Sequence, residues 1–493
     1  MILSPNHPCV HSIYKLIYFR DVTVIFKKIP LQKKSFAPQR FREDIAGVNQ
    51  KVPIGKRQSV PYIYFDNAAS TPALKPVLRE VNDLFNWYSG VHRGTGYKSL
   101  YCSRVYDDCH DTIARFVKAD LDHDTVILVK NTTEAINKLS YRLAFKPGDI
   151  VISTFMEHHS NDLPWRRRGQ VKYVEVDQKG MLDLSDLEKK LKSNYPRVKL
   201  LTVCGASNVT GHINPIHHLA EIAHGYGAEI LVDGAQLVPH QAVDVKPANH
   251  PQHIDYLAFS GHKIYAPFGT GVLIGPRKTF SQGEPEYTGG GTISMVTSKE
   301  VYWAGLPDRE EAGSPNLIGA FALARGLTYL EKTGMENLAG YEEELTNYAM
   351  EQLGKLPGIK IYGAFPRVGV ISFNLPGIGH ALVGSILCLE AGIGVRTGCF
   401  CAQPYVRKLL GIKEDPGQVK AYLDKDVTKL PGMVRISLGA YNTRKEVDVL
   451  IKILKSIIVN KEQYRSNYKF SKTHGHYVPR SLLNKFRLQS VHS

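Results

Sequence analysis

The feature that most constrains the fold is a regular alternation of short apolar runs with longer segments of helical pattern. The seven runs are rich in Val, Ile and Leu, and they span residues 126–129, 149–152, 171–174, 200–203, 229–232, 256–259 and 271–274. Such runs are typical of buried strands, and their alternation with helices is typical of a largely parallel sheet. We therefore predict an α/β fold with a large, mainly parallel sheet.

A smaller unit follows the large one. A helical pattern over residues 317–330 predicts the helix that leaves the large domain, and later runs predict strand, helix, strand and helix at 368–373, 380–387, 434–437 and 446–454. We divide the chain into a basic N-terminal extension, residues 1–40; a segment that leads into the fold, 41–70; a large cofactor-binding domain, 71–325; a small C-terminal α+β domain, 326–460; and a basic C-terminal tail, 461–493.

The net charge of +16 does not by itself indicate a nucleic-acid-binding protein. Residues 1–40 and 461–493 each hold seven Lys or Arg and one acidic residue, so the chain between them carries only +4. A specific binding face needs its basic residues on folded structure, and we expect no specific nucleic-acid partner.

Hydrophobic residues make up 43% of the chain. Because no uninterrupted apolar run reaches the ~18 residues that a membrane span needs, we expect a soluble protein with no membrane partner.

Seven irregularly spaced cysteines are too few for a disulfide framework and favour a reducing compartment. We expect a cytoplasmic protein. The N-terminus is poor in acidic residues and contains Lys15, Arg20, Lys27 and Lys28, which leaves a mitochondrial or other organelle location open.

Two residues that end or follow predicted strands point to chemistry at a carbonyl group. Lys263 follows the run 256–259 closely, and a lysine at the carboxyl edge of a sheet can form a Schiff base with a ligand carbonyl. The alternative is a solvated loop lysine. Asp233 directly follows the run 229–232 and suits a protonated pyridine nitrogen, the contact that makes pyridoxal phosphate an electron sink. The alternative is a cap of the next helix.

Two further segments follow predicted strands. In Asn131-Thr132-Thr133-Glu134, the N–H groups of a helix start and two hydroxyls favour a phosphate, although a plain helix cap is the alternative. In Met156–Asn161, a histidine ring can cover the face of a cofactor. The vicinal histidines lack the spacing of a helical zinc site and have no third ligand near them in the sequence, so we predict no metal.

Taken in order, these motifs resemble those of the class V aminotransferase family of fold type I pyridoxal-phosphate enzymes, and within it the group II cysteine desulfurases. The resemblance covers about residues 41–460. It rests on the segments 64–69, 91–94, 132–134, 156–159, 207–209, 232–236, 260–263, 289–292, 311–316 and 396–402.

The resemblance implies a role for each cofactor-binding residue. Lys263 would form the Schiff base with pyridoxal phosphate, Asp233 would hold the pyridine nitrogen, and His158 would stack on the ring. Gln236 would contact the phenolic oxygen. The residues implied to bind phosphate are Thr132, Thr133, Ser260 and His262, with Thr292 reaching the phosphate of the neighbouring subunit in a homodimer with composite sites.

The resemblance also implies the substrate-binding residues. Arg396 and Asn208 would fix and orient the substrate, because a bidentate guanidinium suits an α-carboxylate. Arg435 matches a further active-site arginine, and we assign His92, in the motif at 91–94, to the substrate as well.

Cys401 lies where the nucleophile of the family would lie, on a predicted loop, whereas a single cysteine is usually a small buried hydrophobe. This chain departs from the desulfurase pattern, since Cys399 and Phe400 stand where familiar members often carry histidines. The Cys-Phe-Cys sequence also resembles molybdenum cofactor sulfurases. Those proteins continue into a large C-terminal domain, which we do not expect in the 33 residues after Asn460.

We therefore expect a pyridoxal-phosphate-dependent cysteine desulfurase, which converts L-cysteine to L-alanine and passes the sulfur from a persulfide on Cys401 to an acceptor protein or thiol. The alternatives within the family are a selenocysteine lyase, a C–S lyase, an epimerase or an aminotransferase. An alternative of another class is a non-catalytic protein that binds RNA or acts as a scaffold through its basic tails.

Overall fold

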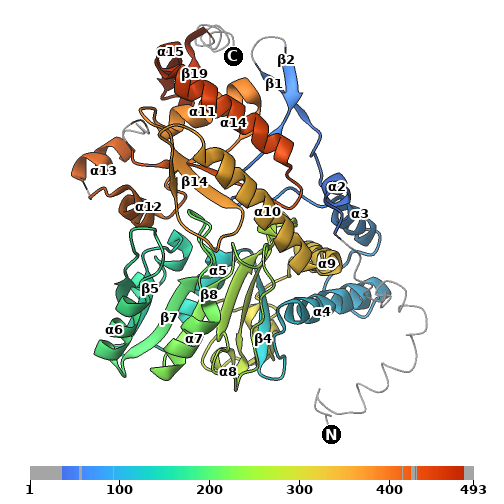
Figure 1. Cartoon of the computed structure of the whole chain (residues 1–493). Helices are drawn as coiled ribbons and strands as arrows, with labels where there is room; N and C mark the ends of the chain where they lie inside the picture. The colour runs from blue at the N-terminus through green and yellow to red at the C-terminus, as the bar shows by residue number, and fades with distance from the viewer. Residues whose placement is uncertain are drawn as a thin grey trace.

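The computed structural model describes residues 36–54, 58–92, 94–413, 415–423, 428 and 430–481. A large domain surrounds the main sheet, and a smaller domain lies against one end of its strands (Figure 1). In Figure 1, the sheet is in the lower half, and the small domain, coloured orange to red, is above it.

The main sheet has seven strands in the order β4-β10-β9-β8-β7-β5-β6. These strands are β4 (Asp124–Val129), β5 (Ile150–Thr154), β6 (Gln170–Val174), β7 (Val198–Cys204), β8 (Glu229–Asp233), β9 (Tyr256–Ser260) and β10 (Gly271–Pro276). Only β10 is antiparallel to its neighbours, and the remaining pairs are parallel. Each of the seven apolar runs is a strand of this sheet, and the predicted α/β fold is confirmed.

Helices cover both faces of the sheet, and its central strands bury side chains on both sides. On β5, for example, Val151 and Ile152 are both fully buried but belong to different clusters. The cluster of Ile152 includes α4 (Tyr97–Val117), α6 (Leu184–Asn194), α7 (Ile216–Gly225) and α9 (Leu317–Thr333), and that of Val151 includes α5 (Thr132–Arg142) and α8 (Arg277–Ser281). This double coverage explains why the central strands are rich in apolar residues.

The small domain has its own core. Its antiparallel sheet has the order β13-β14-β17-β16 and consists of β13 (Lys360–Tyr362), β14 (Val370–Asn374), β17 (Met433–Ser437) and β16 (Arg396–Gly398). The helices α10 (Met335–Gly354), α11 (His380–Ala391) and α14 (Arg444–Val459) share one hydrophobic cluster with it. The strand, helix, strand and helix predicted between residues 368 and 454 are β14, α11, β17 and α14.

Residues 461–481, which the sequence analysis assigned to a tail because of their charge, are folded. They form α15 (Lys461–Asn467) and a hairpin of β18 (Tyr468–Ser471) and β19 (His476–Pro479). Tyr468 is buried in the core of the small domain, and its hydroxyl donates to Glu390 at 2.7 Å. A few apolar side chains among the charged ones are therefore enough to anchor this segment.

The remaining elements are short. They are α2 (Pro38–Glu43), β1 (Lys51–Ile54), β2 (Gln58–Pro61), β3 (Ile63–Tyr64), α3 (Lys75–Leu84), β11 (Ile293–Val296), β12 (Val301–Trp303), β15 (Ile393–Gly394), α12 (Gln403–Leu410) and α13 (Pro416–Leu423), with 3₁₀ turns η2 (His159–Asn161), η3 (Trp165–Arg167), η4 (Gly261–Lys263) and η5 (Asp308–Glu310).

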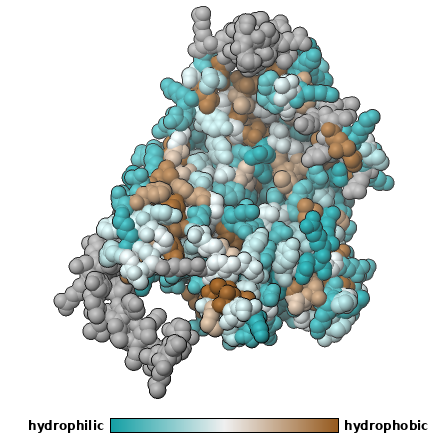
Figure 2. Space-filling view, turned by 180° about the vertical axis from the view of Figure 1, so that it is seen from behind, coloured by the Kyte–Doolittle hydropathy of each residue, from teal (hydrophilic) through white to brown (hydrophobic). Residues whose placement is uncertain are grey.

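Most of the predicted N-terminal extension, residues 1–35, lies outside the described residues. Within the described ranges, no helix combines the length and the apolar character that crossing a bilayer requires. The face opposite that of Figure 1 is mainly hydrophilic and carries several hydrophobic patches, drawn in brown in Figure 2.

Candidate active site

A cavity of about 310 Å³ lies where the main sheet meets the small domain. Strands β7, β8 and β9 end at it, because Cys204, Asp233 and Ser260 are their last residues and all line the cavity. Twelve of the fourteen residues selected from the sequence line it too, namely Thr132, Thr133, His158, Asn208, Asp233, Gln236, Ser260, His262, Lys263, Arg396, Cys401 and Arg435. Lys263 and Asp233 thus lie at the carboxyl edge of the sheet, where the strand pattern predicted them, and the small domain adds Arg396, Cys401 and Arg435.

Lys263 is the central amine of this cavity. The turn η4 places it directly after β9. Burial disfavours the ammonium form and lowers the pKa of Lys263 to about 8, even though the Asp233 carboxylate opposes this shift. An appreciable fraction of the side chain is therefore a neutral amine near pH 7, and this is the form that attacks a carbonyl carbon.

Asp233 and Gln236 present polar atoms to the same space. Asp233 is buried, its pKa is raised by that burial, and it accepts a hydrogen bond from the Ala235 N–H at 3.0 Å. Gln236 Nε2 donates to the Ala68 carbonyl at 2.6 Å, whereas its buried Oε1 has no hydrogen-bond partner among the described residues. Native structures rarely leave such an atom unpaired, so this oxygen points to a polar ligand.

The start of α5 presents N–H groups and hydroxyls beside these residues. Asn131 caps the helix, since its Oδ1 accepts a hydrogen bond from a first-turn N–H at 3.0 Å. Thr132 N donates to Ser260 Oγ at 2.8 Å. A Cβ on Gly271 would come within 2.5 Å of Asn131 Cα, so only glycine lets β10 approach this loop. The helix dipole and the hydroxyls together favour a phosphate here.

His158 lies in the cavity as a neutral ring. Burial, assisted by the positive charge of Lys263, lowers the pKa of His158 to about 3. Ser160 N donates to His158 Nδ1 at 3.1 Å, so the proton of the neutral imidazole is on Nε2. Burial and Lys263 likewise lower the pKa of His262, to about 4. Neither ring therefore adds positive charge at neutral pH.

Two arginines of the small domain share one carboxylate. Arg396 and Arg435 lie directly opposite each other on β16 and β17, and Asp66 accepts from both, at 2.8 Å and 2.9 Å respectively. Arg435 is buried and also donates to the Asn208 carbonyl at 2.9 Å. The Arg396 side chain is 50% exposed. Arg396 therefore keeps donors available for a second carboxylate, whereas Arg435 is held by the protein.

Cys401 is exposed on the loop between β16 and α12. Its φ is +54°, that of Phe400 is +53°, and both angles are unfavourable for residues with a Cβ. Two hydrogen bonds hold this conformation. Asn208 Nδ2 donates to the Phe400 carbonyl at 2.7 Å, and His159 N donates to the Cys401 carbonyl at 2.7 Å. The loop thus presents the Cys401 thiol to the cavity.

Thr292 and His92 lie outside the cavity. Thr292 is fully buried, and its hydroxyl donates to the Gly289 carbonyl at 2.9 Å. His92 Nε2 lies 2.9 Å from Asp107 Oδ1. His92 lines a separate surface hollow together with the neighbours of Thr292, Gly291 and Ile293. Their assigned roles in phosphate and substrate binding stay predictions, since within one chain neither side chain reaches the cavity.

Sequence reasoning missed several residues that shape the site. Asp66 was part of the motif at 64–69 but received no role, although it holds both arginines. Ser160 Oγ lies 2.7 Å from Thr133 Oγ1. Glu157 is fully buried, and burial raises its pKa to about 8 against hydrogen bonds that favour the carboxylate. The one signal that could have indicated Asp66, Glu157 and Ser160 was their position in the segments 64–69 and 156–161.

The residues of the cavity fit pyridoxal phosphate. A buried amine suits its aldehyde, a buried carboxylate suits its ring nitrogen, and a helix start with hydroxyls suits its phosphate. The unpaired Gln236 Oε1 and the low pKa of Lys263 are observations of the protein alone that agree with this fit.

The fold and this site define a pyridoxal-phosphate-dependent enzyme of fold type I. Residues 63–450 match the family model for class-V aminotransferases, and the chain belongs to this family.

Among its curated relatives is a cysteine desulfurase of Haloferax volcanii, 35% identical over 404 residues, covering 80% of this chain and 88% of the relative. A cysteine desulfurase of Serratia proteamaculans is 36% identical over 435 residues, covering 86% of this chain and 98% of the relative. The structure is also similar to that of a cysteine desulfurase from Thermococcus onnurineus, with a TM-score of 0.75, 34% identity, and coverage of 86% of this chain and 98% of that one.

Proposed function

We propose that this protein is a pyridoxal-phosphate-dependent cysteine desulfurase that removes sulfur from L-cysteine and releases L-alanine. The observation that carries the proposal is the presence of Cys401 on the cavity that also contains Lys263 and Arg396. A thiol, a reactive amine and a carboxylate-binding cation thereby meet around one small volume. The relatives named cysteine desulfurase match this chain over most of their length, which supports the same function.

The residues around the cavity divide into three binding tasks. Asp233 and Gln236 would hold the cofactor ring, with the neutral His158 ring on its face. The phosphate would lie at the start of α5. When bound, the cofactor withdraws electrons from the amino acid attached to it and so weakens bonds at Cα and Cβ. Arg396 would bind the substrate carboxylate through the donors that Asp66 leaves available.

Two residues then carry out the proton transfer and the sulfur transfer. The Lys263 amine takes the proton from the substrate Cα, a role that its pKa of about 8 suits. The Cys401 thiolate attacks the substrate sulfur. A sulfur–sulfur bond forms, the Cβ–S bond breaks, and its electron pair remains on Cβ, which takes up a proton. One sulfur atom thus moves from cysteine to Cys401 as a persulfide, and alanine is the other product.

The persulfide requires an acceptor, and the exposed position of Cys401 allows a thiol or a protein with a reactive cysteine to approach it.

We also infer a homodimer. Large apolar side chains are exposed on both sequence stretches that surround the hollow of His92, namely Phe85, Trp87, Tyr88, Tyr97 and Leu100, and Tyr287, Met295, Val296, Val301 and Tyr302. A second subunit would cover them. The cytoplasmic location stays a prediction.

The test follows absorbance and product release in the purified protein. We expect a band near ~420 nm that requires Lys263, and alanine with sulfide or persulfide from L-cysteine. Lys263→Ala and Cys401→Ala should both abolish sulfur release. Cys399→Ala is the matched control, because the Cys399 thiol donates to the Pro431 carbonyl at 3.1 Å and does not line this cavity.

Two outcomes would contradict the proposal. If added cofactor produces no band, the protein is not an enzyme of this kind. If the band is present but Cys401→Ala still turns over an amino acid at the wild-type rate, the chemistry belongs to another member of the family, such as a selenocysteine lyase or an aminotransferase.

A further inference from the structure

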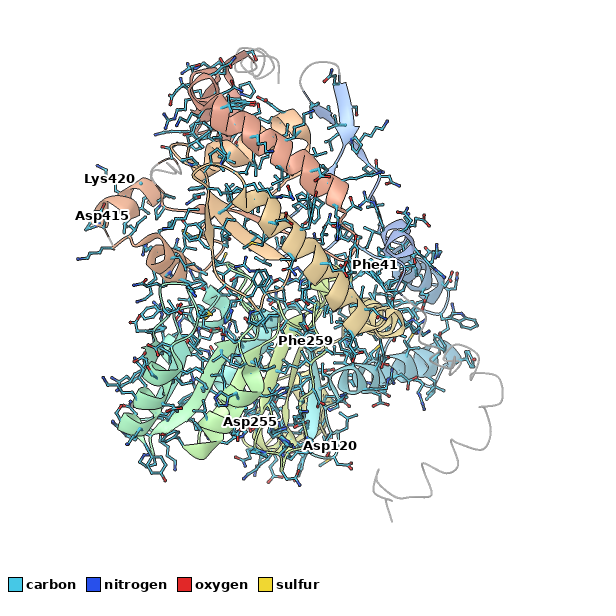
Figure 3. All side chains as sticks on the ribbon, viewed as in Figure 1. Phe41, Asp120, Asp255, Phe259, Asp415 and Lys420 are labelled. Carbon is cyan, nitrogen blue, oxygen red and sulfur yellow. The ribbon has the colours of Figure 1, made fainter. Side chains whose placement is uncertain are left out.

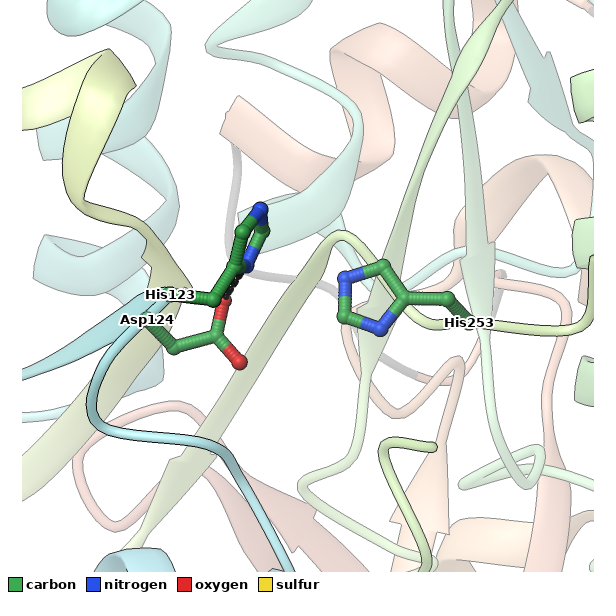
Figure 4. A group of neighbouring side chains, drawn as sticks. All are labelled: His123, Asp124 and His253. Atoms are coloured by element: carbon green, nitrogen blue, oxygen red, sulfur yellow. Dashed lines mark hydrogen bonds and ion pairs between the residues drawn. The ribbon is translucent and has the colours of Figure 1, made fainter. Parts of the chain in front are cut away.

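A cluster of three potential metal ligands lies at the edge of the main sheet opposite the active site. Asp124 is the first residue of β4, His123 precedes it, and His253 lies in the loop before β9 (Figure 4). One ligand atom from each residue lies within 4.8 Å of the other two. Figure 3 shows the position of this edge, because the labelled Asp120 and Asp255 mark it below Phe259, which is near the active-site end of β9.

Two atoms of this cluster are buried without a hydrogen-bond partner. Asp124 is 1% exposed and His253 is 3% exposed. Among the described residues, neither Asp124 Oδ2 nor His253 Nε2 has a partner. Buried polar atoms of this kind are few in native proteins, and two of them beside each other indicate a shared missing partner.

The hydrogen bond on the other side of the His253 ring identifies the kind of partner. His253 Nδ1 lies 2.8 Å from the Lys246 carbonyl. Since a carbonyl only accepts, Nδ1 carries a proton, and in the neutral imidazole Nε2 then presents its lone pair to the cluster. Metal-binding histidines are oriented by the same kind of contact, in which the second ring nitrogen donates to a carbonyl.

The remaining member of the cluster is close enough to take part. His123 Nδ1 lies 2.8 Å from Asp124 Oδ1, and its ring lies 5.6 Å from that of His253. The His123 side chain is 40% exposed, which gives an ion access from solvent. Moving the proton of this ring from Nδ1 to Nε2 frees Nδ1 as a ligand without a change in net charge.

We propose that His123, Asp124 and His253 bind one Zn²⁺-type cation. Two imidazoles and one carboxylate are ligands that Zn²⁺ and Co²⁺ prefer, whereas Ca²⁺ and Mg²⁺ prefer oxygen alone. Bonds of about 2.0–2.1 Å place neighbouring ligands of a tetrahedral ion roughly 3.3 Å apart, so only small side-chain movements are needed. The fourth position is open to water. The bound ion would link the start of β4 to the loop before β9, across β10. This metal site is independent of the proposed desulfurase activity.

The experiment measures Zn²⁺ binding to the full chain by calorimetry, with metal content per chain after dialysis. All proteins carry Cys399→Ser and Cys401→Ser, so that the active-site thiols do not bind the metal. Asp124→Asn and His253→Gln are the test variants. The control is His250→Gln, an exposed histidine of the same loop. We expect the parent and the control to bind one Zn²⁺ per chain at this cluster. In both test variants, the affinity of this site for Zn²⁺ should fall at least about tenfold.

Two further measurements keep the result decisive. Co²⁺ should give the visible bands of a tetrahedral nitrogen and oxygen site in the parent but not in the test variants, and Zn²⁺ should raise the Tm of the parent and the control only. If Asp124→Asn or His253→Gln does not fold, His123→Gln on the part-exposed ring replaces it. Equal stoichiometry and affinity in all variants, or no binding in the parent, would overturn the proposal.

Discussion

At the residue scale, the active site depends on charges that are held out of their usual state by burial. Burial lowers the pKa of Lys263 to about 8 and that of His158 to about 3, so the His158 ring is neutral near pH 7 and an appreciable fraction of Lys263 is a neutral amine. Asp66 provides the negative charge that keeps Arg396 and Arg435 together on adjacent strands. The cavity therefore offers a partly neutral amine near pH 7 next to a fixed cation, and that cation can bind the carboxylate of an amino acid.

The first prediction concerns the pH at which Lys263 reacts. Below its pKa the ammonium form cannot attack an aldehyde, so attachment of pyridoxal phosphate to the apoprotein should accelerate about tenfold per pH unit and level off above about pH 8. An ordinary lysine would continue to accelerate toward ~10.4. Stopped-flow absorbance of cofactor binding between pH 6 and pH 10 checks this. A rate that still rises steeply at pH 10 would show that burial does not lower the pKa.

At the element scale, the second prediction separates the structural and the binding effects of a helix cap. Asn131→Ala removes the cap of α5 and should cost about 1 kcal/mol of unfolding free energy. Because this helix start is the expected phosphate site, cofactor affinity should also fall about threefold to tenfold. Asp183→Ala, which removes the cap of α6 away from the cavity, is the matched control. Equal cofactor affinity in both variants would show that the phosphate does not bind at the start of α5.

A third prediction addresses the hairpin after residue 460. Tyr468 is 4% exposed in the core of the small domain, so Tyr468→Ala should destabilise the protein by about 3 kcal/mol through lost burial. The next residue on β18, Lys469, is exposed, and Lys469→Ala should change stability by less than about 0.5 kcal/mol. Chemical denaturation compares the two. If Tyr468→Ala lowers the unfolding free energy as little as Lys469→Ala does, the hairpin adds no stability to the small domain.

The elements also show what could be predicted from the sequence. The seven strands were predictable because burial leaves apolar runs, and Lys263 and Asp233 because strand ends meet at one edge of a parallel sheet. Arg396, Cys401 and Arg435, which the small domain supplies, were indicated by the family resemblance. The hairpin of residues 468–479 was not, since two strands of four residues with charged neighbours give little periodic signal. The contacts of Asp66 and the cluster of Asp124 with His253 join distant parts of the chain, and no local pattern reveals them.

At the scale of the whole molecule, the main sheet separates two kinds of site. The strands end at the cavity on one edge, where the small domain supplies Arg396, Cys401 and Arg435. Among the described residues, no second domain covers the opposite edge, and there the proposed metal site would join the start of β4 to the loop before β9, across β10. Catalysis thus depends on how the two domains meet, whereas the metal would act on the sheet alone. In the proposed homodimer, only the first of these would depend on a second subunit.

The last prediction tests that dependence. If Thr292 acts in the site of the partner subunit, a heterodimer of a Lys263→Ala chain and a Thr292→Val chain contains one site with both residues intact. Each variant alone should have little activity at limiting cofactor, and the heterodimer, purified through two different tags after co-expression, should regain about half of the wild-type activity, since one of its two sites is complete.

A matched heterodimer distinguishes this arrangement from mere stabilisation of weak variants. Lys263 and Asp233 line the same cavity of one chain, so a heterodimer of Lys263→Ala and Asp233→Asn chains has a defect in both sites and should stay inactive. Recovery with Thr292→Val but not with Asp233→Asn would assign Thr292 to the site of the partner. If neither heterodimer regains activity, Thr292 acts only within its own chain, where its hydroxyl donates to the Gly289 carbonyl.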